Sequence, residues 1–537
     1  MRVFPMAALA QSVEHWIVIP GVTGSIPVCR PKIKGPVKRK FAGAFPIGVS
    51  KMSNSPSAFP LVGLVPEKVW AWFSTLCAIP HPSKGEGELR QHLAHWARER
   101  GLASSIDGAG NLIIRKPASP GKETAPGVVL QAHLDMVCQK NTGSAHDFCR
   151  DSIKASIVDG WLLAQETTLG ADNGIGVALI MAVLADDTLV HGPIEALLTI
   201  DEEAGMGGAR GLESGILAGR LMLNLDTEDW GEFYLGCAGG LDVDVQRVSE
   251  PETIPPTLVV RRLVLQGLRG GHSGVNIHEE RGNANKLLIR ILQSLPMSFR
   301  LCRFHGGTAR NALPREAFAE IAVVPDDLVI LHEAVEHLEA VLRTELQGVE
   351  AGLSLELLPA AATQVMPMSE QTLWLDSLHA APHGVHRMSC LVPGIVETSN
   401  NLGIVVLAPE GGSCNFMVRS LVDTAAQALA AQIVSLFRLS GSSAECSGFY
   451  PGWAPNPASP LLALCQRVFT RDFSAESKVK VVHAGLECGI IGEKYPGMDI
   501  VSFGPNIRGA HAPGERVEIA SVAKVWALLT AILAEIA

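Results

Sequence analysis

The sequence contains no Cys-x-x-Cys pair, although 11 cysteines are spread over its 537 residues. Pairs of this kind mark structural zinc sites and redox motifs, so the sequence does not favour either class. Scattered cysteines in apolar surroundings instead indicate free thiols in a reducing compartment. We therefore expect a cytoplasmic protein.

A positive net charge is also lacking, because the formal charge is −10. This argues against a nucleic-acid partner. The basic residues that are present gather in residues 1–51, a proline-broken segment with eight Lys or Arg and one Glu. This segment resembles the product of translation through a transfer-RNA gene, and it lacks the parts of a targeting peptide. We predict that it is a mistranslated or disordered extension and that the chain starts at Met52.

The sequence has no long uninterrupted apolar run, short internal repeat or low-complexity tract. The apolar C-terminal stretch, residues 519–537, contains Lys524 and Glu535 and is slightly short for a membrane span. We predict a core helix there and no membrane partner.

Three short apolar runs end in clusters of acidic or imidazole side chains. Runs of this kind are typical of buried parallel strands, and open α/β sheets bind ligands beyond the carboxyl ends of such strands. The runs and the residues that follow them are 128–132 before His133, 194–200 before Asp201, Glu202 and Glu203, and 221–225 before Asp226. The sequence therefore predicts a site at one edge of a sheet.

Two further segments carry side chains of the same kind. Asp172 lies in a glycine-flanked loop, 170–174, that opens an apolar helix, and His511 follows Gly509-Ala. Imidazoles and carboxylates are ligands for zinc, cobalt or manganese. Residues i and i+2 at a strand end face the same side, so Asp135 is placed to orient the ring of His133.

Each cluster also has an ordinary interpretation when it is taken alone. A His-x-Asp sequence occurs often by chance, and Asp-Glu-Glu is usually a solvated loop. Asp-Asn-Gly is usually a turn, and Asn-Leu-Asp most often caps a helix. Only the combination, in this order along the chain, indicates a metal site.

That order resembles the M20 metallopeptidase family, and within it the aminoacyl-histidine dipeptidases. The resemblance runs from about Leu64 to the C-terminus and rests on these phrases: His133-Leu-Asp-Met-Val-Cys, Leu169-Gly-Ala-Asp-Asn-Gly-Ile-Gly, Asp201-Glu-Glu and Leu223-Asn-Leu-Asp-Thr-Glu. One departure is Ala510-His-Ala-Pro-Gly-Glu515, where the family usually has Ser-Pro-Asp-Glu after the histidine. The ligand His511 is retained.

The resemblance implies an α/β catalytic domain of the di-zinc exopeptidase type, with a mixed, largely parallel sheet flanked by helices. It also implies an inserted α+β lid, which in related enzymes forms a dimer. We expect the catalytic domain at 52–238 and 444–537 and the lid at 239–443.

The resemblance also implies residue roles. It gives two divalent ions, most simply Zn²⁺ with Co²⁺ or Mn²⁺ as alternatives, and it gives Glu202 as general base, Asp135 as the residue that orients His133, and His272 as the residue that polarises the scissile carbonyl. The implied metal ligands are His133, Asp172, Glu203, Asp226 and His511, with Asp172 between the ions. The implied substrate-binding residues are Asn311, Arg310 and Arg419. His483 and Glu487 match another phrase of the subgroup and receive no role.

The implied reaction is metal-dependent hydrolysis of dipeptides, including Xaa-His, by a water held between the ions. Alternatives are an M20 tripeptidase or aminoacylase, an inactive metal-binding homologue, and a dimeric scaffold. Retention of Glu202 argues against an inactive site, because a purely structural metal site needs no unligated base. A scaffold would not explain so many converging polar residues.

Overall fold

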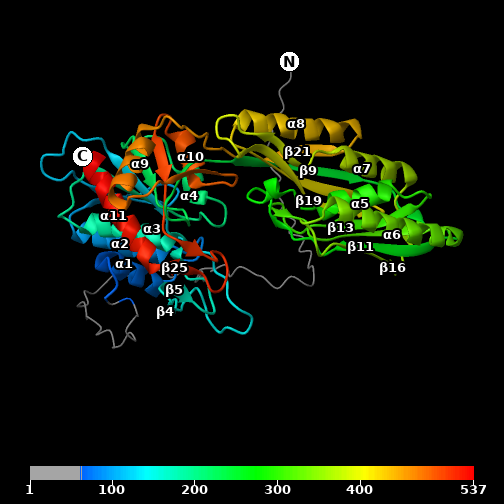
Figure 1. Cartoon of the computed structure of the whole chain (residues 1–537), viewed down its shortest axis with the longest axis horizontal. Coiled ribbons are helices and arrows are strands. Elements are labelled where there is room, and N and C mark those ends of the chain that lie inside the picture. The colour runs from blue at the N-terminus through cyan, green and yellow to red at the C-terminus, as the bar shows by residue number, and fades with distance from the viewer. Residues whose placement is uncertain (1–60, 62, 537) are drawn as a thin grey trace, which may run out of the picture.

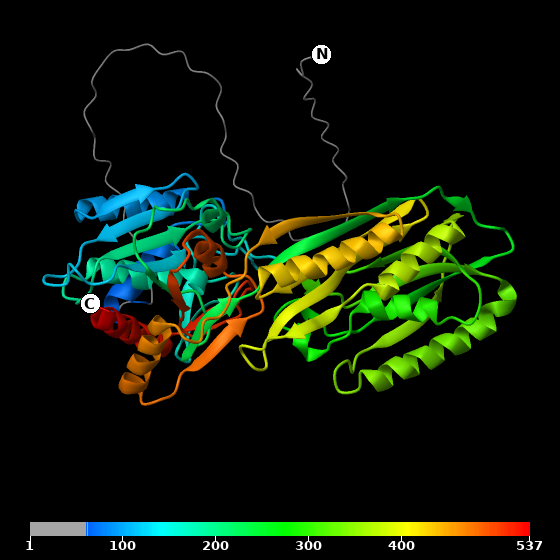
Figure 2. The ribbon, with the colours of Figure 1, turned by 90° about the horizontal axis from the view of Figure 1, so that it is seen from above.

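The computed structural model describes Leu61 and residues 63–536 as two domains joined end to end (Figure 1). Seen from above, the domains again lie side by side along the long axis (Figure 2). The expected extension 1–51 and the expected start at Met52 lie outside the described residues.

The first domain is built on an eight-stranded mixed sheet, as predicted. Its central strands are parallel to one another: β3 pairs with β6 and β7, and β7 pairs with β23. In sheet order the strands are β1 (Ala103–Ile106), β2 (Leu112–Lys116), β6 (Ile194–Thr199), β3 (Val128–His133), β7 (Leu221–Asn224), β23 (Asp499–Ser502), β8 (Glu232–Cys237) and β22 (Lys478–Val482). The three predicted apolar strands are thus neighbours, and their carboxyl ends meet at one edge.

Helices cover both faces of this sheet because successive strand residues point to opposite sides. Val128 and Leu130 belong to the main core, whereas Val129 packs into a smaller cluster on the other face. The main core is formed with α1 (Glu67–Ala78), α2 (Gly87–Glu99), α3 (Ala171–Ala185), α9 (Pro460–Phe473) and α11 (Ile519–Ile536). The other face carries α4 (Gly207–Gly211) and α10 (Glu487–Lys494). A small sheet of β4 (Ala155–Val158), β5 (Trp161–Ala164), β24 (Ile507–Arg508) and β25 (Arg516–Glu518) completes the domain.

Helix α11 is long and apolar enough to cross a membrane by length and composition alone. In the structure its residues Val522, Leu529 and Leu533 are buried in the main core, and the helix contacts α9 and α3. The prediction of a core helix is confirmed by this packing.

The second domain is built on a nine-stranded antiparallel sheet with helices packed on one face. In sheet order its strands are β16 (Ser354–Pro359), β11 (Val259–Gln266), β15 (Ala317–Val323), β13 (Arg300–Gly306), β19 (Val396–Ala408), β20 (Gly411–Ser420), β9 (Gly239–Val248) and β21 (Ser443–Tyr450), with β18 (Gly384–Met388) pairing β19. The helices are α5 (Ala284–Gln293), α6 (Leu328–Glu345), α7 (Met368–Ala380) and α8 (Asp423–Leu439), and they share one core with the sheet. This is the α+β lid that the sequence predicts.

The chain enters the lid after β8 and returns to the first domain after β21. Strand β21 pairs with β9 and therefore belongs to the lid sheet. We accordingly propose that the lid spans 239–450, so that it ends at Tyr450 rather than at residue 443.

Candidate active site

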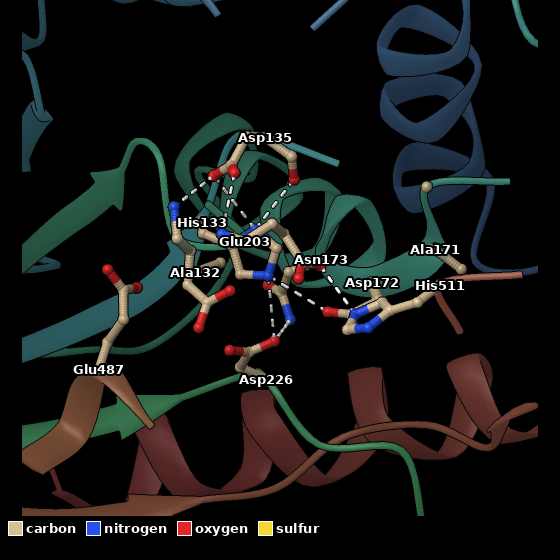
Figure 3. A network of polar contacts seen from close by, with 12 residues as sticks. Ala132, His133, Asp135, Ala171, Asp172, Asn173, Glu203, Asp226, Glu487 and His511 are labelled. Carbon is tan, nitrogen blue, oxygen red and sulfur yellow. Dashed lines mark hydrogen bonds and ion pairs between the residues drawn. The ribbon is translucent and has the colours of Figure 1, made fainter. Parts of the chain in front are cut away.

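The site forms where the carboxyl ends of β3, β6 and β7 meet. His133 is the last residue of β3, Glu202 and Glu203 lie in the turn after β6, and Asp226 follows β7. Figure 3 shows His133, Glu203 and Asp226 around Asp172, with His511 on the far side. The register that pairs His133 with Thr199 explains why these polar residues emerge at the same level.

Asp172 lies at the centre of the site. Its Oδ1 is 3.2 Å from Nε2 of His133, and its Oδ2 is 3.2 Å from Nε2 of His511. His511 Nε2 is also 3.1 Å from Glu203 Oε1, and His133 Nε2 is 3.5 Å from Asp226 Oδ1. The five residues form two groups of three that share Asp172, and in each group the ligand atoms lie within 4.8 Å of one another.

The start of α3 presents Asp172 rigidly. Gly170 has φ of 72°, and Asp172 and Asn173 depart from helical geometry, so the predicted loop is the irregular first turn of the helix. The buried carboxylate of Glu515 accepts main-chain N–H groups from Leu169, Gly170, Ala171 and Asp172 at 2.7–3.2 Å. Glu515 thereby ties the segment of His511 to that of Asp172. Glu515 ends the sequence motif around His511 but was not among the predicted site residues.

The electrostatics of this cluster favour a cation. The pKa of His511 rises to about 11 because it bonds to Asp172 and Glu203. Burial alone lowers the pKa of His133, yet Asp226 and the other neighbouring carboxylates raise it well above its usual value. The cluster has three carboxylates but only two imidazoles, so it attracts additional positive charge. The carboxylate oxygens and imidazole nitrogens are ligand atoms that zinc, cobalt or manganese prefer.

Glu202 lies beside the five candidate ligands. It forms a further group with His133 and Glu203 in which one atom of each lies within 4.8 Å of the others. Burial raises its pKa well above the usual value, and the charges of Glu203, Asp226 and Glu487 add to this effect. A carboxyl group in such surroundings binds a proton readily.

Asp135 acts on the site in a different way from the one expected. Nδ1 of His133 donates to the main-chain carbonyl of Asp135 at 2.9 Å, whereas the Asp135 carboxylate is 3.6 Å away, too far for a hydrogen bond. The carboxylate instead accepts the N–H groups of Glu202 and Glu203, at 2.9 and 3.1 Å, and the Ser83 hydroxyl at 2.7 Å. Asp135 therefore orients His133 through its carbonyl and fixes the Glu202–Glu203 turn through its side chain.

Two predicted lid residues, His272 and Arg419, lie together in a second polar cluster. Arg419 is 4% exposed, and its guanidinium donates to the hydroxyls of Tyr450 at 2.8 Å and Ser273 at 3.4 Å, while its Nη2 lies 3.4 Å from Nε2 of His272. Burial and the charge of Arg419 lower the pKa of His272 to about 4. The guanidinium is therefore buried among uncharged groups, an arrangement that favours an anion.

The other two predicted substrate residues are placed differently. Arg310 forms an ion pair with Asp242, so its guanidinium already has a partner. The main-chain carbonyl of Asn311 accepts the N–H of Ser273 at 2.8 Å, and its side chain is exposed. Substrate binding by these two residues stays a prediction.

The segment from His483 to Glu487 links the two clusters. His483 Nε2 lies 2.8 Å from the hydroxyl of Ser399 in the lid. Glu487 accepts hydrogen bonds from Gln131 and Thr199, at 2.7 and 2.6 Å, just below the ends of β3 and β6. Figure 3 shows Glu487 beside the metal-ligand cluster. This short segment thus contacts the lid at one end. At its other end it contacts β3 and β6, the strands that carry candidate metal ligands at their ends.

Comparison with known proteins agrees with this architecture. Residues 264–350 match the model of a peptidase dimerisation domain. The chain is 44% identical over 476 residues to the cytosol non-specific dipeptidase of Escherichia coli (strain K12), covering 88% of this chain and 98% of that protein.

Solved structures give the same result. The aminoacylhistidine dipeptidase of Vibrio alginolyticus superposes with a TM-score of 0.82 at 44% identity, covering 89% of this chain and 98% of that one. The aminopeptidase PepT of Bacillus cereus shares the fold at 17% identity, with a TM-score of 0.52 and coverage of 88% and 99%. With a relative of this identity aligned over nearly its whole length, the chain belongs to the M20 family of metallopeptidases.

Proposed function

We propose that this protein is a metal-dependent dipeptidase of broad specificity that cleaves Xaa-His among other dipeptides. The observation that carries the proposal is the pair of ligand groups sharing Asp172, with the Glu202 carboxyl alongside. The names of the two relatives at 44% identity, a non-specific dipeptidase and an aminoacylhistidine dipeptidase, support the substrate class.

Five side chains would hold two divalent cations, most simply Zn²⁺ with Co²⁺ or Mn²⁺ as alternatives. One group is His133, Asp172 and Asp226, and the other is Asp172, Glu203 and His511. Such ions, when bound, lower the pKa of a water molecule and polarise a carbonyl group.

Glu202 would serve as general base. Its raised pKa suits a group that takes a proton from the attacking water and returns it to the leaving amine. Asp135 supports this role, because it holds the main chain of Glu202 in place.

His272 would stabilise the negative charge that develops on the scissile carbonyl oxygen. Its Nδ1 accepts the N–H groups of Gly274 and Val275, at 3.2 and 3.0 Å, so the proton of the neutral ring lies on Nε2. A pKa of about 4 keeps the ring neutral at pH 7, and Nε2–H is then a donor that does not depend on protonation of the ring.

Arg419 would bind the terminal carboxylate of the dipeptide. Its Nη2 and the Nε2–H of His272 are both donors, so at 3.4 Å they do not satisfy each other and leave room for acceptor oxygens. A planar guanidinium suits a carboxylate, which can accept two parallel hydrogen bonds. A dipeptide places its scissile carbonyl and its carboxylate one residue apart, which fits two adjacent donors.

We further propose that the protein is cytoplasmic and forms a homodimer through its lid. The match of 264–350 to a dimerisation domain supports the dimer. The location is supported by the name of the Escherichia coli relative and by nine free cysteines in the part of the chain that the structure describes.

The proposal is tested with purified protein that is stripped of metal and reloaded with Zn²⁺, Co²⁺ or Mn²⁺. Substrates are an Xaa-His dipeptide, a tripeptide and an N-acetyl amino acid, and Glu202→Gln is the matched control. Metal-dependent cleavage of the dipeptide, lost in Glu202→Gln, is the expected result. Preference for the tripeptide or the acetylated substrate would show that the protein is a tripeptidase or an aminoacylase instead. Metal binding without any hydrolysis would show that it is an inactive homologue.

A further inference from the structure

The part of the lid that matches the dimerisation domain lies within one complete structural motif of four strands and two helices. It has the order β-α-β-β-α-β, formed by β11, α5, β13, β15, α6 and β16. Its four strands lie in the sheet order β16-β11-β15-β13, and each neighbouring pair is antiparallel. We call residues 259–359 the inner unit.

The rest of the lid has the same architecture. The outer unit consists of β9, α7, β19, β20, α8 and β21, which is again β-α-β-β-α-β. Its strands lie in the order β21-β9-β20-β19, all antiparallel, so the fourth, first, third and second strands follow one another as in the inner unit. The inner unit is inserted between β9 and α7, and a ribbon of β10 (Glu252–Thr253) and β17 (Gln364–Val365) brackets the insertion.

The two units meet through the same strand of each. The second strand of the inner unit, β13, pairs antiparallel with the second strand of the outer unit, β19, with Phe304 opposite Leu407 and Gly306 opposite Val405. The sheet order is therefore the same when it is read from either edge, as a two-fold axis between β13 and β19 requires. Figure 1 shows these strands side by side in the middle of the lid. A single unit would leave this edge open for a second copy, which is how an isologous dimer forms.

We propose that the lid is a dimer of dimerisation units within one chain and that it completes the active site of that same chain. The inference rests on the proposed function. His272 belongs to the inner unit and Arg419 to the outer unit, yet their side-chain nitrogens are 3.4 Å apart. Ser273 of the inner unit also contacts Arg419. The substrate-binding cluster is therefore built across the junction of the two units, and both units come from one chain.

Contacts between the lid and the first domain also indicate that the lid completes the active site of its own chain. Gly274 approaches the main chain of His483 so closely that a side chain at Gly274 would collide with the His483 carbonyl oxygen. Ser399 of the outer unit hydrogen-bonds the His483 ring. Both units thus contact the segment that leads to Glu487 and to the metal ligands of the same chain. A homodimer through another lid surface is compatible with this arrangement but is not needed for the chemistry.

Subunit complementation tests the inference. His272→Gln and Glu202→Gln chains, carrying different tags, are co-expressed, and dimers that contain one chain of each kind are isolated through both tags. If His272 served the partner's site, each mixed dimer would regain one intact site of its two, and the isolated mixed dimers would reach about one half of the wild-type activity. We expect no more activity than the sum of the two single variants.

Two additions make every outcome informative. Should His272→Gln fail to fold, Arg419→Lys chains paired with Glu202→Gln chains repeat the test, because both lid residues would act in trans together. The assay is then run at a low dipeptide concentration, where the raised KM of Arg419→Lys lowers its rate. Should no mixed dimer form, wild-type kcat is measured over a dilution series alongside the mass of the active species. An active monomer supports the inference, and activity that disappears with the dimer overturns it, as does complementation. Absence of wild-type hydrolysis would instead count against the proposed function.

Discussion

The carboxylate of Glu515 accepts the main-chain N–H of Asp172 at 3.2 Å, although 343 residues separate the two. Three neighbouring N–H groups, from Leu169 to Ala171, point to the same carboxylate. The central candidate ligand is therefore held by a side chain from the last part of the chain. Partners of this kind, one step removed from the metal, fix the orientation of the ligands.

We expect Glu515→Gln to weaken metal binding by about 10- to 100-fold, the range for loss of such supporting contacts. The amide has one acceptor oxygen in place of two and cannot satisfy all four N–H groups. Affinity is measured by competition with a chromophoric chelator. The exposed Glu476→Gln is the control. Unchanged affinity in Glu515→Gln would show that Asp172 is fixed by α3 alone.

Asp135→Asn should lower kcat more than it changes overall stability. The new amide group would direct N–H bonds at the N–H of Glu202 or of Glu203, and an unsatisfied buried donor costs about 1–3 kcal/mol. We expect a loss of roughly 10- to 100-fold in kcat. Ser83→Ala removes only the hydroxyl that donates to Asp135, so its effect should be several-fold at most. Equal effects of the two variants would contradict this role of the Asp135 carboxylate.

Arg419→Lys should raise KM for dipeptides while changing kcat much less. Lysine keeps the charge but loses the planar pair of donors, and a hydrogen bond to a charged group contributes about 1.5–3 kcal/mol, or roughly 10- to 100-fold in KM. A dipeptide amide reports on the same contact. Wild type should bind it poorly, and Arg419→Lys should distinguish it less from the free acid. The exposed Arg303→Lys in the same sheet should behave as wild type.

His483 makes the stability of the protein depend on pH. Burial and the nearby charge of Arg419 lower its pKa to about 3, whereas the unfolded chain has the ordinary value of about 6.5. Between these values the unfolded state binds a proton that the folded state does not. The free energy of unfolding therefore falls as the pH falls below about 6.5.

Replacement of His483 by glutamine should reduce this dependence. The wild-type slope should exceed that of His483→Gln by up to about 1.4 kcal/mol per pH unit between about pH 6 and pH 4. Urea denaturation at several pH values gives both slopes. His332→Gln, at an exposed position on α6, is the matched control for the loss of an imidazole. Parallel curves for wild type and His483→Gln would show that His483 is protonated in the folded protein.

Part of the candidate metal-ligand cluster was predictable from a local pattern. His133 and Asp226 come at the ends of apolar strands, and parallel strands bring such ends to one edge. The pairing of three strands then places the side chains together without further information.

Other contacts were not predictable, because they depend on atoms that the fold brings together. Whether His133 meets the carbonyl or the carboxylate of Asp135 depends on the turn after β3. The pairing of Arg310 with Asp242 and the role of Glu515 depend on segments distant in sequence.

The sequence by itself predicted the strand ends, because strand periodicity is a local property, and its motifs gave the resemblance to the family and with it the candidate ligand set. Only the tertiary structure decided how the lid is built. Its two units have no visible sequence repeat, and one unit is inserted into the other. Their equivalence is therefore seen in the order of their strands in the sheet and not in their amino-acid sequences. The cluster of His272 and Arg419 arises at that junction, where packing between distant segments brings a buried cation beside a neutral imidazole.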